Sequence, residues 1–147
     1  MKLSTRARYG TRALLDLAVH RSDEPVSLKD IAKRQQISLQ YLEHLMTPLI
    51  AAGMVRSIEG PKGGVLMAKS PKDIKLSEII YLLEGSIAPV DCVDNPKVCP
   101  RAELCVTRDI WEEVKKAMEG VLQTTTLQSL IERQEKKKTL KQEMYYI

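Results

Sequence analysis

The chain has 147 residues, of which 44% are hydrophobic, and a formal net charge of +4 at pH 7. This length predicts one domain, with room for an appended module, and this composition supports a packed core. We predict a soluble cytoplasmic protein, because no apolar run is long enough to span a membrane and the first residues lack the hydrophobic region of a signal peptide.

A helix is predicted over residues 5–20, where apolar side chains recur with helical spacing. Its apolar face is formed by Ala7, Leu14, Leu15, Leu17 and Ala18. Its beginning is strongly basic, with cations at Lys2, Arg6, Arg8 and Arg12. The amino end of a helix beside several cations favours phosphate contact. A solvated charged face is the alternative.

Two short helices separated by a turn are predicted next. Leu28, Ile31 and Ala32 share one face of the first helix, and Ser27 is its predicted N-cap. Residues 35–38 predict a tight turn, and Ser38 is suited to cap the second helix. The apolar stripe of the second helix consists of Tyr41, Leu42, Leu45, Met46, Leu49 and Ile50.

A glycine-bent hairpin is predicted after Gly53, which ends the second helix. Its strands contain residues 55–58 and 65–67, and residues 60–64 form the turn. Helix, turn, helix and hairpin in this order predict a winged helix-turn-helix, whose second helix enters the major groove of DNA. The predicted fold class is therefore mainly α with a small β-hairpin wing.

The predicted DNA-contacting residues lie at the beginning of the first helix, on the exposed side of the reading helix and in the wing. Gln side chains can pair with adenine edges, Glu can accept from cytosine N4, and a wing lysine can reach phosphate or the minor groove. The set is Lys2, Arg6, Arg8, Ser38, Gln40, Tyr41, Glu43, His44, Arg56, Lys62, Gly63 and Gly64. Glu59 is unfavourable beside phosphate, and Arg56 offsets it. Residues 1–69 hold 11 Lys and Arg against 6 Asp and Glu, whereas residues 70–147 hold 12 against 13, so the positive charge coincides with this reader.

The second half of the chain predicts three further helices. A helix over residues 76–83 packs on the first helix and ends at Gly85, and a helix over residues 106–122 carries a continuous apolar stripe with Trp111 beside it. That stripe is predicted to be a dimer seam, with packing inside the subunit as the alternative. A short helix is predicted over residues 124–131, followed by a solvated lysine run and an apolar tail at residues 144–147 that docks elsewhere. The stripe consists of Ile110, Val114, Ala117, Met118 and Val121.

Three cysteines, Cys92, Cys99 and Cys105, lie in or at the end of a predicted loop over residues 86–104. An odd number of cysteines without a secretion signal favours metal or redox chemistry over a disulfide framework. The wide C-x6-C-x5-C spacing favours an iron–sulfur cluster over zinc, which more often uses C-x2-C pairs. Zinc and three ordinary thiols remain as alternatives. Three cysteines leave at least one coordination position of a metal centre open. The candidates for a further ligand are Asp91, Asp94, Glu103, Asp109, Glu112 or a group of a partner subunit.

The segments MKLSTRARYG, ISLQYLEHLM and GPKGG, together with the cysteine loop, resemble the Rrf2 family of bacterial regulators. This family includes the iron–sulfur cluster regulator, the nitric-oxide-sensing repressor and the cysteine-metabolism repressor. The resemblance implies a homodimeric winged-helix transcription factor with a long dimerisation helix. In its cluster-binding members, cysteines that match Cys92, Cys99 and Cys105 hold a [2Fe-2S] or [4Fe-4S] cluster. We favour [2Fe-2S] here, with zinc as the alternative.

Two departures from the family pattern bear on these expectations. The iron–sulfur cluster regulator often has histidine where this chain has Arg108, and family wings often have arginine where this chain has Glu59. The segment EGSIAPV and the apolar tail instead resemble the cysteine-metabolism repressor branch, which lacks the cysteine triad and responds to a partner enzyme of cysteine synthesis.

We therefore predict a winged helix-turn-helix DNA-binding domain over residues 1–85, a cysteine loop over residues 86–105, and a dimerisation helix with a C-terminal helix and tail over residues 106–147. The predicted function is sequence-specific transcriptional regulation as a homodimeric repressor on a palindromic operator, sensing iron–sulfur cluster or redox status. The alternative is a repressor of the cysteine-metabolism type that responds to a partner protein, with cysteines that bind zinc or act as redox thiols. An enzyme is not predicted, because the chain offers no Cys–His pairing, nucleotide loop or convergent acid–base set.

Overall fold

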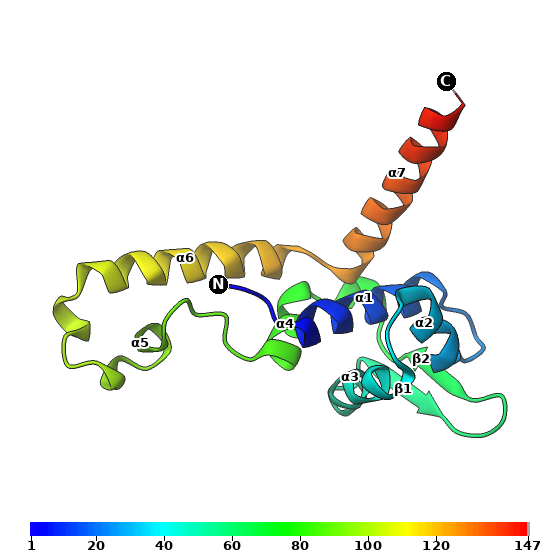
Figure 1. Cartoon of the computed structure of the whole chain (residues 1–147), viewed down its shortest axis with the longest axis horizontal. Helices are drawn as coiled ribbons and strands as arrows, with labels where there is room; N and C mark the ends of the chain where they lie inside the picture. Colours follow the sequence, from blue (N-terminus) through cyan, green and yellow to red (C-terminus); the bar gives the residue numbers. More distant parts are fainter. Residues whose placement is uncertain (147) are drawn as a thin grey trace.

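The computed structural model describes residues 1–146 (Figure 1). This part of the chain is mainly helical, with seven α-helices and one antiparallel pair of strands. The helices are α1 (Thr5–Val19), α2 (Leu28–Gln35), α3 (Leu39–Ala51), α4 (Leu76–Glu84), α5 (Asp91–Asp94), α6 (Val106–Thr124) and α7 (Leu127–Tyr145). The strands are β1 (Val55–Ile58) and β2 (Gly64–Met67), and short 3-10 turns lie at Pro71–Asp73, Pro96–Val98 and Ala102–Leu104. The predicted fold class is confirmed.

Helix α1 is the centre of the core, because α2, α3, α4 and the start of α7 all pack against it. Each surrounding element contributes fully buried aliphatic side chains, including Leu42 of α3 and Ile79 of α4. Gly10 is buried where α1 meets α4, and a Cβ at that position would collide with a methyl group of Leu83. A side chain at position 10 would therefore require the Leu83 side chain to shift.

Helix α3 buries most of its predicted stripe, and one member was predicted wrongly. Leu42, Leu45, Met46 and Leu49 are buried, whereas Ile50 is 37% exposed. Successive residues of an α-helix are about 100° apart, so Ile50 lies at the edge of the stripe that Leu49 centres. Gly53 follows the helix with φ of 75°, a left-handed conformation that glycine adopts without steric cost.

The strands form the predicted hairpin with Val55 opposite Met67 and Ile58 opposite Gly64. The segment before α2 adds one bridge to this hairpin, because the N–H groups of Val26 and Val65 each donate to the other residue's carbonyl at 2.9 Å. The wing is thereby fixed to the start of the helix-turn-helix.

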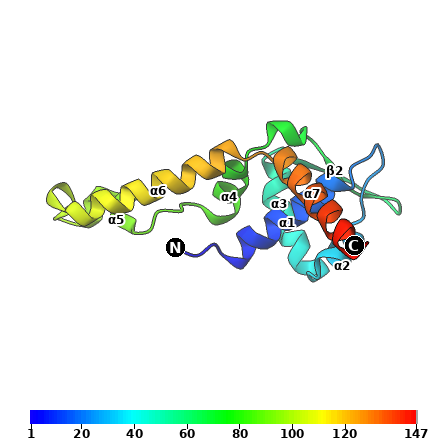
Figure 2. The same ribbon diagram turned by 90° about the horizontal axis from the view of Figure 1, so that it is seen from above.

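Helices α6 and α7 extend away from this core in different directions (Figures 1 and 2). The prediction of a helix over residues 106–122 is confirmed and extends to Thr124, and none of the residues of α6 is buried. The prediction of a short helix over residues 124–131 is wrong. Helix α7 begins at Leu127, where Thr126 accepts the Ser129 N–H, and continues to Tyr145.

Only the first turns of α7 belong to the core. Leu127 and Ile131 are buried, and the Leu127 N–H donates to the Ile74 carbonyl at 2.9 Å. Tyr145 and Tyr146, in the predicted docking tail, are 78% and 91% exposed and do not pack on residues 1–146, while Ile147 lies outside the described residues. No helix of the described chain is long and apolar enough to cross a membrane.

Candidate nucleic-acid interface and cysteine loop

The turn between α2 and α3 fixes the orientation of the reading helix α3. Ser27 caps α2 and Ser38 caps α3, as predicted, by accepting the N–H of Lys29 and of Tyr41. Gln36 lies between them in the left-handed region, with φ of 55°. The Ile37 N–H donates to the Ala32 carbonyl at 3.0 Å, and the Ile37 side chain is buried under the turn.

A buried carboxylate on α1 holds the end of α2. The Asp16 side chain is 2% exposed, and its two oxygens accept from the Arg34 guanidinium, with the shortest contact at 2.7 Å. Gln35 Nε2 donates to the same carboxylate at 2.7 Å. Burial alone would raise the pKa of Asp16, but the hydrogen bonds from Arg34 and Gln35 and the charge of Arg34 hold it below its ordinary value. Sequence reasoning missed this anchor, although an aspartate inside the apolar run of α1 was its signal.

The exposed side of α3 carries three of the predicted base-contacting residues. Gln40, Glu43 and His44 are exposed and lie within one turn of each other. Ser38 is exposed, but its hydroxyl already accepts the Tyr41 N–H at 3.2 Å. Tyr41 is half-buried, because its ring meets that of Tyr9 edge to face with centroids 6.3 Å apart.

The amino end of α1 presents exposed cations beside this tyrosine pair. Lys2, Arg6 and Arg8 are exposed, and the Arg8 guanidinium lies 5.7 Å from the centre of the Tyr9 ring. Arg12 lies 5.3 Å from the same ring and donates to the Gln35 carbonyl at 2.9 Å, so it also joins α1 to the end of α2. Arg8 thus lies beside the tyrosine pair through which α1 meets α3.

The wing carries two further cations of the predicted DNA-contacting set. Arg56 and Lys62 are exposed. A groove between the wing and the helix-turn-helix is lined by Lys29 of α2, Glu43 of α3 and Glu59 of the wing, among others. Sequence reasoning did not select Lys29, although a basic residue two positions after the cap Ser27 was an available signal. In Figure 1, α3 and the hairpin lie on the side of the molecule away from α6 and α7.

Gly63 and Gly64 have a packing role inside the protein. A Cβ on Gly63 would meet the carbonyls of Ile58 and Gly60, and a Cβ on Gly64 would meet the Val26 carbonyl. These glycines therefore allow the wing to fold tightly on itself and on the strand before α2. Their predicted close approach to a duplex stays a prediction.

The cysteine loop runs beside α6, with all three thiols half-buried. Cys105 is the N-cap residue of α6, and its Sγ lies 3.2 Å from the Thr107 hydroxyl. That hydrogen bond, followed by one from the Arg108 backbone N–H, lowers the pKa of the Cys105 thiol and favours the thiolate that metals bind. Arg108, at the position of the expected histidine, donates through Nε to the Cys92 carbonyl at 2.9 Å.

The donor set suits a soft metal centre, but its members are not brought together. Across residues 1–146, no group of three or more His, Cys, Asp or Glu side chains is close enough to hold a metal ion. Two of the acidic residues considered as further ligands have other partners. Asp94 accepts from Ser86 and pairs with Lys115, which lowers the pKa of Asp94, and Glu112 pairs with Lys116 at 3.4 Å.

Known proteins match this chain over most of its length. The family model Rrf2, an iron-dependent transcriptional regulator, matches residues 3–133. Protein rrf2 of Nitratidesulfovibrio vulgaris is 50% identical over 131 residues, which cover 89% of this chain and 87% of that protein. The solved structure of CymR, the global cysteine regulator of B. subtilis, has a TM-score of 0.75 and 37% identity, and covers 90% of this chain and 98% of that one. The T. potens IscR structure has a TM-score of 0.73 and 41% identity, over 90% and 88%.

These relatives confirm the predicted resemblance and the prediction that the chain is not an enzyme. With a winged helix-turn-helix, an exposed side of α3 and matches of this extent, the chain belongs to the Rrf2 family of transcriptional regulators.

Proposed function

We propose that this protein is a homodimeric repressor that reads a palindromic operator through α3 and its wing. The observation that carries the proposal is the exposure of Gln40, Glu43 and His44 on one side of α3, together with exposed cations at the start of α1 and on the wing. Cations of this kind position a protein on phosphates, whereas Gln and Glu side chains read base edges.

The dimer is supported by the open side of α6. Ile110 and Val121 are 51% and 65% exposed in the single chain, although they belong to the apolar stripe. Apolar side chains in a continuous row on an exposed helix favour burial against a second copy. A two-fold dimer places two reading helices on half-sites about one helical turn of DNA apart.

Binding-site selection with the Gln40→Ala variant tests the DNA-reading part. We expect discrimination at one base pair of each half-site to fall by about 1–3 kcal/mol, the value of a bidentate Gln–adenine contact. The matched control is Gln123→Ala on α6, which removes an exposed glutamine remote from the reading helix. A selected sequence preference that is the same for Gln40→Ala and wild type would show that Gln40 does not read the operator.

We further propose that Cys92, Cys99 and Cys105 hold an iron–sulfur cluster, with [2Fe-2S] favoured and zinc as the alternative. A bound cluster would make the loop sensitive to iron supply and redox state. The clustering of all three thiols in the loop beside α6 supports this site, and the lowered pKa of Cys105 suits a ligand. Loading requires the thiols to move together, because they are not gathered in the described structure.

Metal content after anaerobic purification tests this site. We expect brown wild-type protein and a Cys99→Ala variant without iron and sulfide, because only two thiolates remain. Val98→Ala, a change at a neighbouring side chain that is 55% exposed, should load normally. Colourless wild-type protein with zinc would favour the zinc alternative, and equal iron and sulfide in Cys99→Ala would contradict the assignment.

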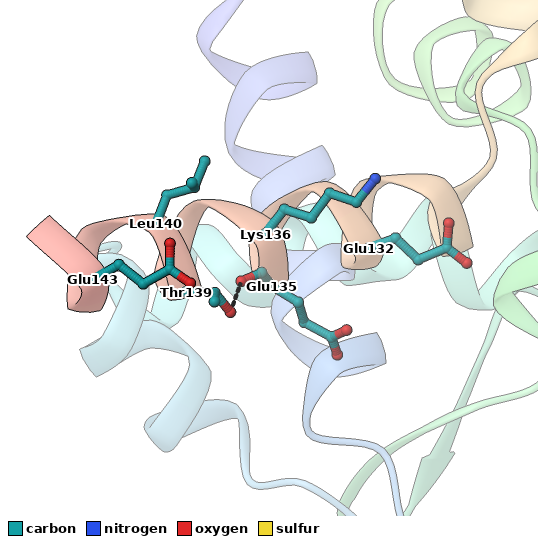
Figure 3. A pocket seen from close by; sticks show the side chains of 6 residues that line it. All are labelled: Glu132, Glu135, Lys136, Thr139, Leu140 and Glu143. Atoms are coloured by element: carbon teal, nitrogen blue, oxygen red, sulfur yellow. Dashed lines mark hydrogen bonds between the residues drawn. The ribbon is translucent and has the colours of Figure 1, made fainter.

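A second candidate function, control by a partner enzyme of cysteine synthesis, is favoured by the end of α7. Leu140 is 60% exposed, and Met144 and Tyr145 are 77% and 78% exposed. Figure 3 shows that the groove along this segment is lined by α7 alone, from Glu132 to Glu143, with the Thr139 hydroxyl donating to the Glu135 carbonyl at 3.1 Å. The lining of this groove is mostly charged or polar, and the exposed Leu140, Met144 and Tyr145 supply the apolar side chains for a hydrophobic groove of a partner.

Titration of the wild-type chain and of a chain ending at Thr139 with a purified enzyme of cysteine synthesis tests this second candidate. Binding that requires residues 140–147 would support it. The absence of binding by the full chain would exclude it and leave the DNA-reading proposal unchanged.

A further inference from the structure

Five polar side chains connect the cysteine loop to α4 and α6, and we call them the polar clasp. The Ser86 hydroxyl donates to the Asp94 carboxylate, and the Tyr81 hydroxyl donates to the Glu119 carboxylate. Lys115 joins the two halves, because its Nζ lies 2.9 Å from Asp94 Oδ1 and 3.6 Å from Glu119 Oε1. The members therefore come from α4, the segment after it, α5 and α6.

The polar clasp attaches the middle of the cysteine loop to α6. Asp94 ends α5 and lies between Cys92 and Cys99 in sequence. Lys115 stands ten residues after Cys105, which corresponds to about 15 Å along the helix axis. Asp94 is bound at Lys115, and the Cys92 carbonyl accepts from Arg108 in the first turn of α6, so the cysteine loop is attached to α6 at two points.

These polar contacts matter more here than on an ordinary surface. No side chain of α6 is buried in the described chain, so α6 has little apolar packing to hold the loop. The side chains of Lys115 and Glu119 are only 22% and 21% exposed. Partial removal from water strengthens the attraction between their charges. Asp94 is 36% exposed, so this end of the clasp can exchange with water more readily.

We propose that the polar clasp is a gate that restrains the cysteine loop, in which the three thiols are not gathered, until Asp94 leaves Lys115. This inference rests on the proposed function for its purpose, because it describes how loading of the cysteine site is controlled. Its physical content concerns only the metal-free chain: release of Asp94 sets how freely Cys92 and Cys99 move. Lys115→Met removes the central charge and keeps the aliphatic stem.

Alkylation of each cysteine by iodoacetamide, followed by mass spectrometry on anaerobic, metal-free protein, tests the gate. This reagent is uncharged, so a change of charge at residue 115 does not alter its approach. In Lys115→Met we expect Cys92 and Cys99 to react about two- to fivefold faster, the change that loss of one partly exposed ion pair makes to an opening equilibrium. Cys105, which is hydrogen-bonded to Thr107 at the start of α6, should keep its wild-type alkylation rate.

The matched control is Lys116→Met on the neighbouring position of α6. Among residues 1–146, Lys116 pairs only within its own helix, with Glu112 at 3.4 Å, and its side chain is 70% exposed. We expect wild-type alkylation rates for this variant. Tyr81→Phe, which removes a single hydroxyl at the other end of the clasp, should accelerate Cys92 and Cys99 in the same direction as Lys115→Met.

A double-mutant cycle with Asp94→Asn decides whether the clasp acts as a unit. If Asp94 and Lys115 act through each other, the double variant should react no faster than the faster single variant. Multiplying effects, unchanged rates in Lys115→Met, or an equal increase in Lys116→Met would each overturn the proposal. Thiol rates need neither metal nor DNA, so faster alkylation in a protein that loads no metal would support the gate and contradict only the cluster.

Discussion

The winged-helix body (residues 1–85) and the C-terminal arm (residues 106–146) differ in how far their apolar side chains are buried. The body buries its aliphatic residues around α1, including Leu14, Leu17 and Leu42 at 0% exposure. The arm leaves Ile110, Val121 and Leu140 at 51%, 65% and 60% exposure. The body is therefore packed within the single chain, with Leu127 and Ile131 of α7 in its core, whereas the rest of the arm leaves apolar side chains exposed.

The largest expected effect comes from Leu42→Ala in the body. This change leaves a cavity beneath α3, and we expect a loss of about 2–5 kcal/mol in the free energy of unfolding. Chemical denaturation followed by circular dichroism measures it. A loss below about 1 kcal/mol would contradict the tight packing of the body around α1.

The next effect separates assembly from folding. Ile110→Glu places a charge on the exposed stripe of α6, and we expect dimer dissociation to increase about 30-fold or more, equivalent to about 2 kcal/mol. Sedimentation equilibrium measures this constant. Gln123→Glu, an equal change of charge on the polar side of α6, is the control. Equal dimer stability in the two variants would show that the apolar stripe of α6 is not the dimer interface.

Asp16→Asn tests the polar anchor within the body. We expect a loss of about 1.5–3 kcal/mol at pH 7, because the charged hydrogen bonds from Arg34 and Gln35 are weakened. The folded pKa of Asp16 lies below its ordinary value, so this stabilisation is fully present above about pH 4 and is lost as the pH falls through the folded pKa. The difference between wild type and variant should therefore shrink below about pH 4. If the difference in the free energy of unfolding stayed constant down to about pH 2, the loss would come from packing and not from the charge of Asp16.

The smallest effect is expected at the end of the arm. Leu140→Ser changes a side chain that is 60% exposed, so we expect the free energy of unfolding to change by less than about 0.5 kcal/mol. Thermal melting in the presence and absence of a purified cysteine-synthesis enzyme measures both stability and partner binding. A loss above about 1 kcal/mol without the enzyme would show that α7 packs on a second copy of the chain.

The elements of the body could be predicted from the sequence, because each has one buried face and its apolar residues recur with the period of a helix or a strand. The caps Ser27 and Ser38, the stripe of α3 and the hairpin at residues 55–67 all lie where local patterns predict them. Helix α7 was predicted too short for the same reason. Only its first turns are buried, and beyond Ile131 the helix continues through good helix formers, such as Lys136 and Glu143, without an apolar period.

The candidate sites were less predictable, because they depend on contacts between distant residues. The pairing of Asp16 with Arg34 joins residues 18 positions apart, and that of Asp94 with Lys115 joins residues 21 positions apart. Cysteine spacing predicts a ligand set but does not reveal that Asp94 pairs with Lys115 or that Arg108 binds the Cys92 carbonyl. The residues of the DNA interface were chosen by type and helix side, and their individual contacts stay predictions.

The contact between Gly10 and Leu83 has a consequence for the operator. It sets how α4 lies on α1, and α4 leads through the loop to α6. In the proposed dimer joined by α6, a tilt of α4 relative to α6 would move the winged-helix body of one subunit relative to that of the other. In the proposed dimer, a side chain at position 10 would therefore be felt as a changed preference for the number of base pairs between half-sites, far from any nucleotide.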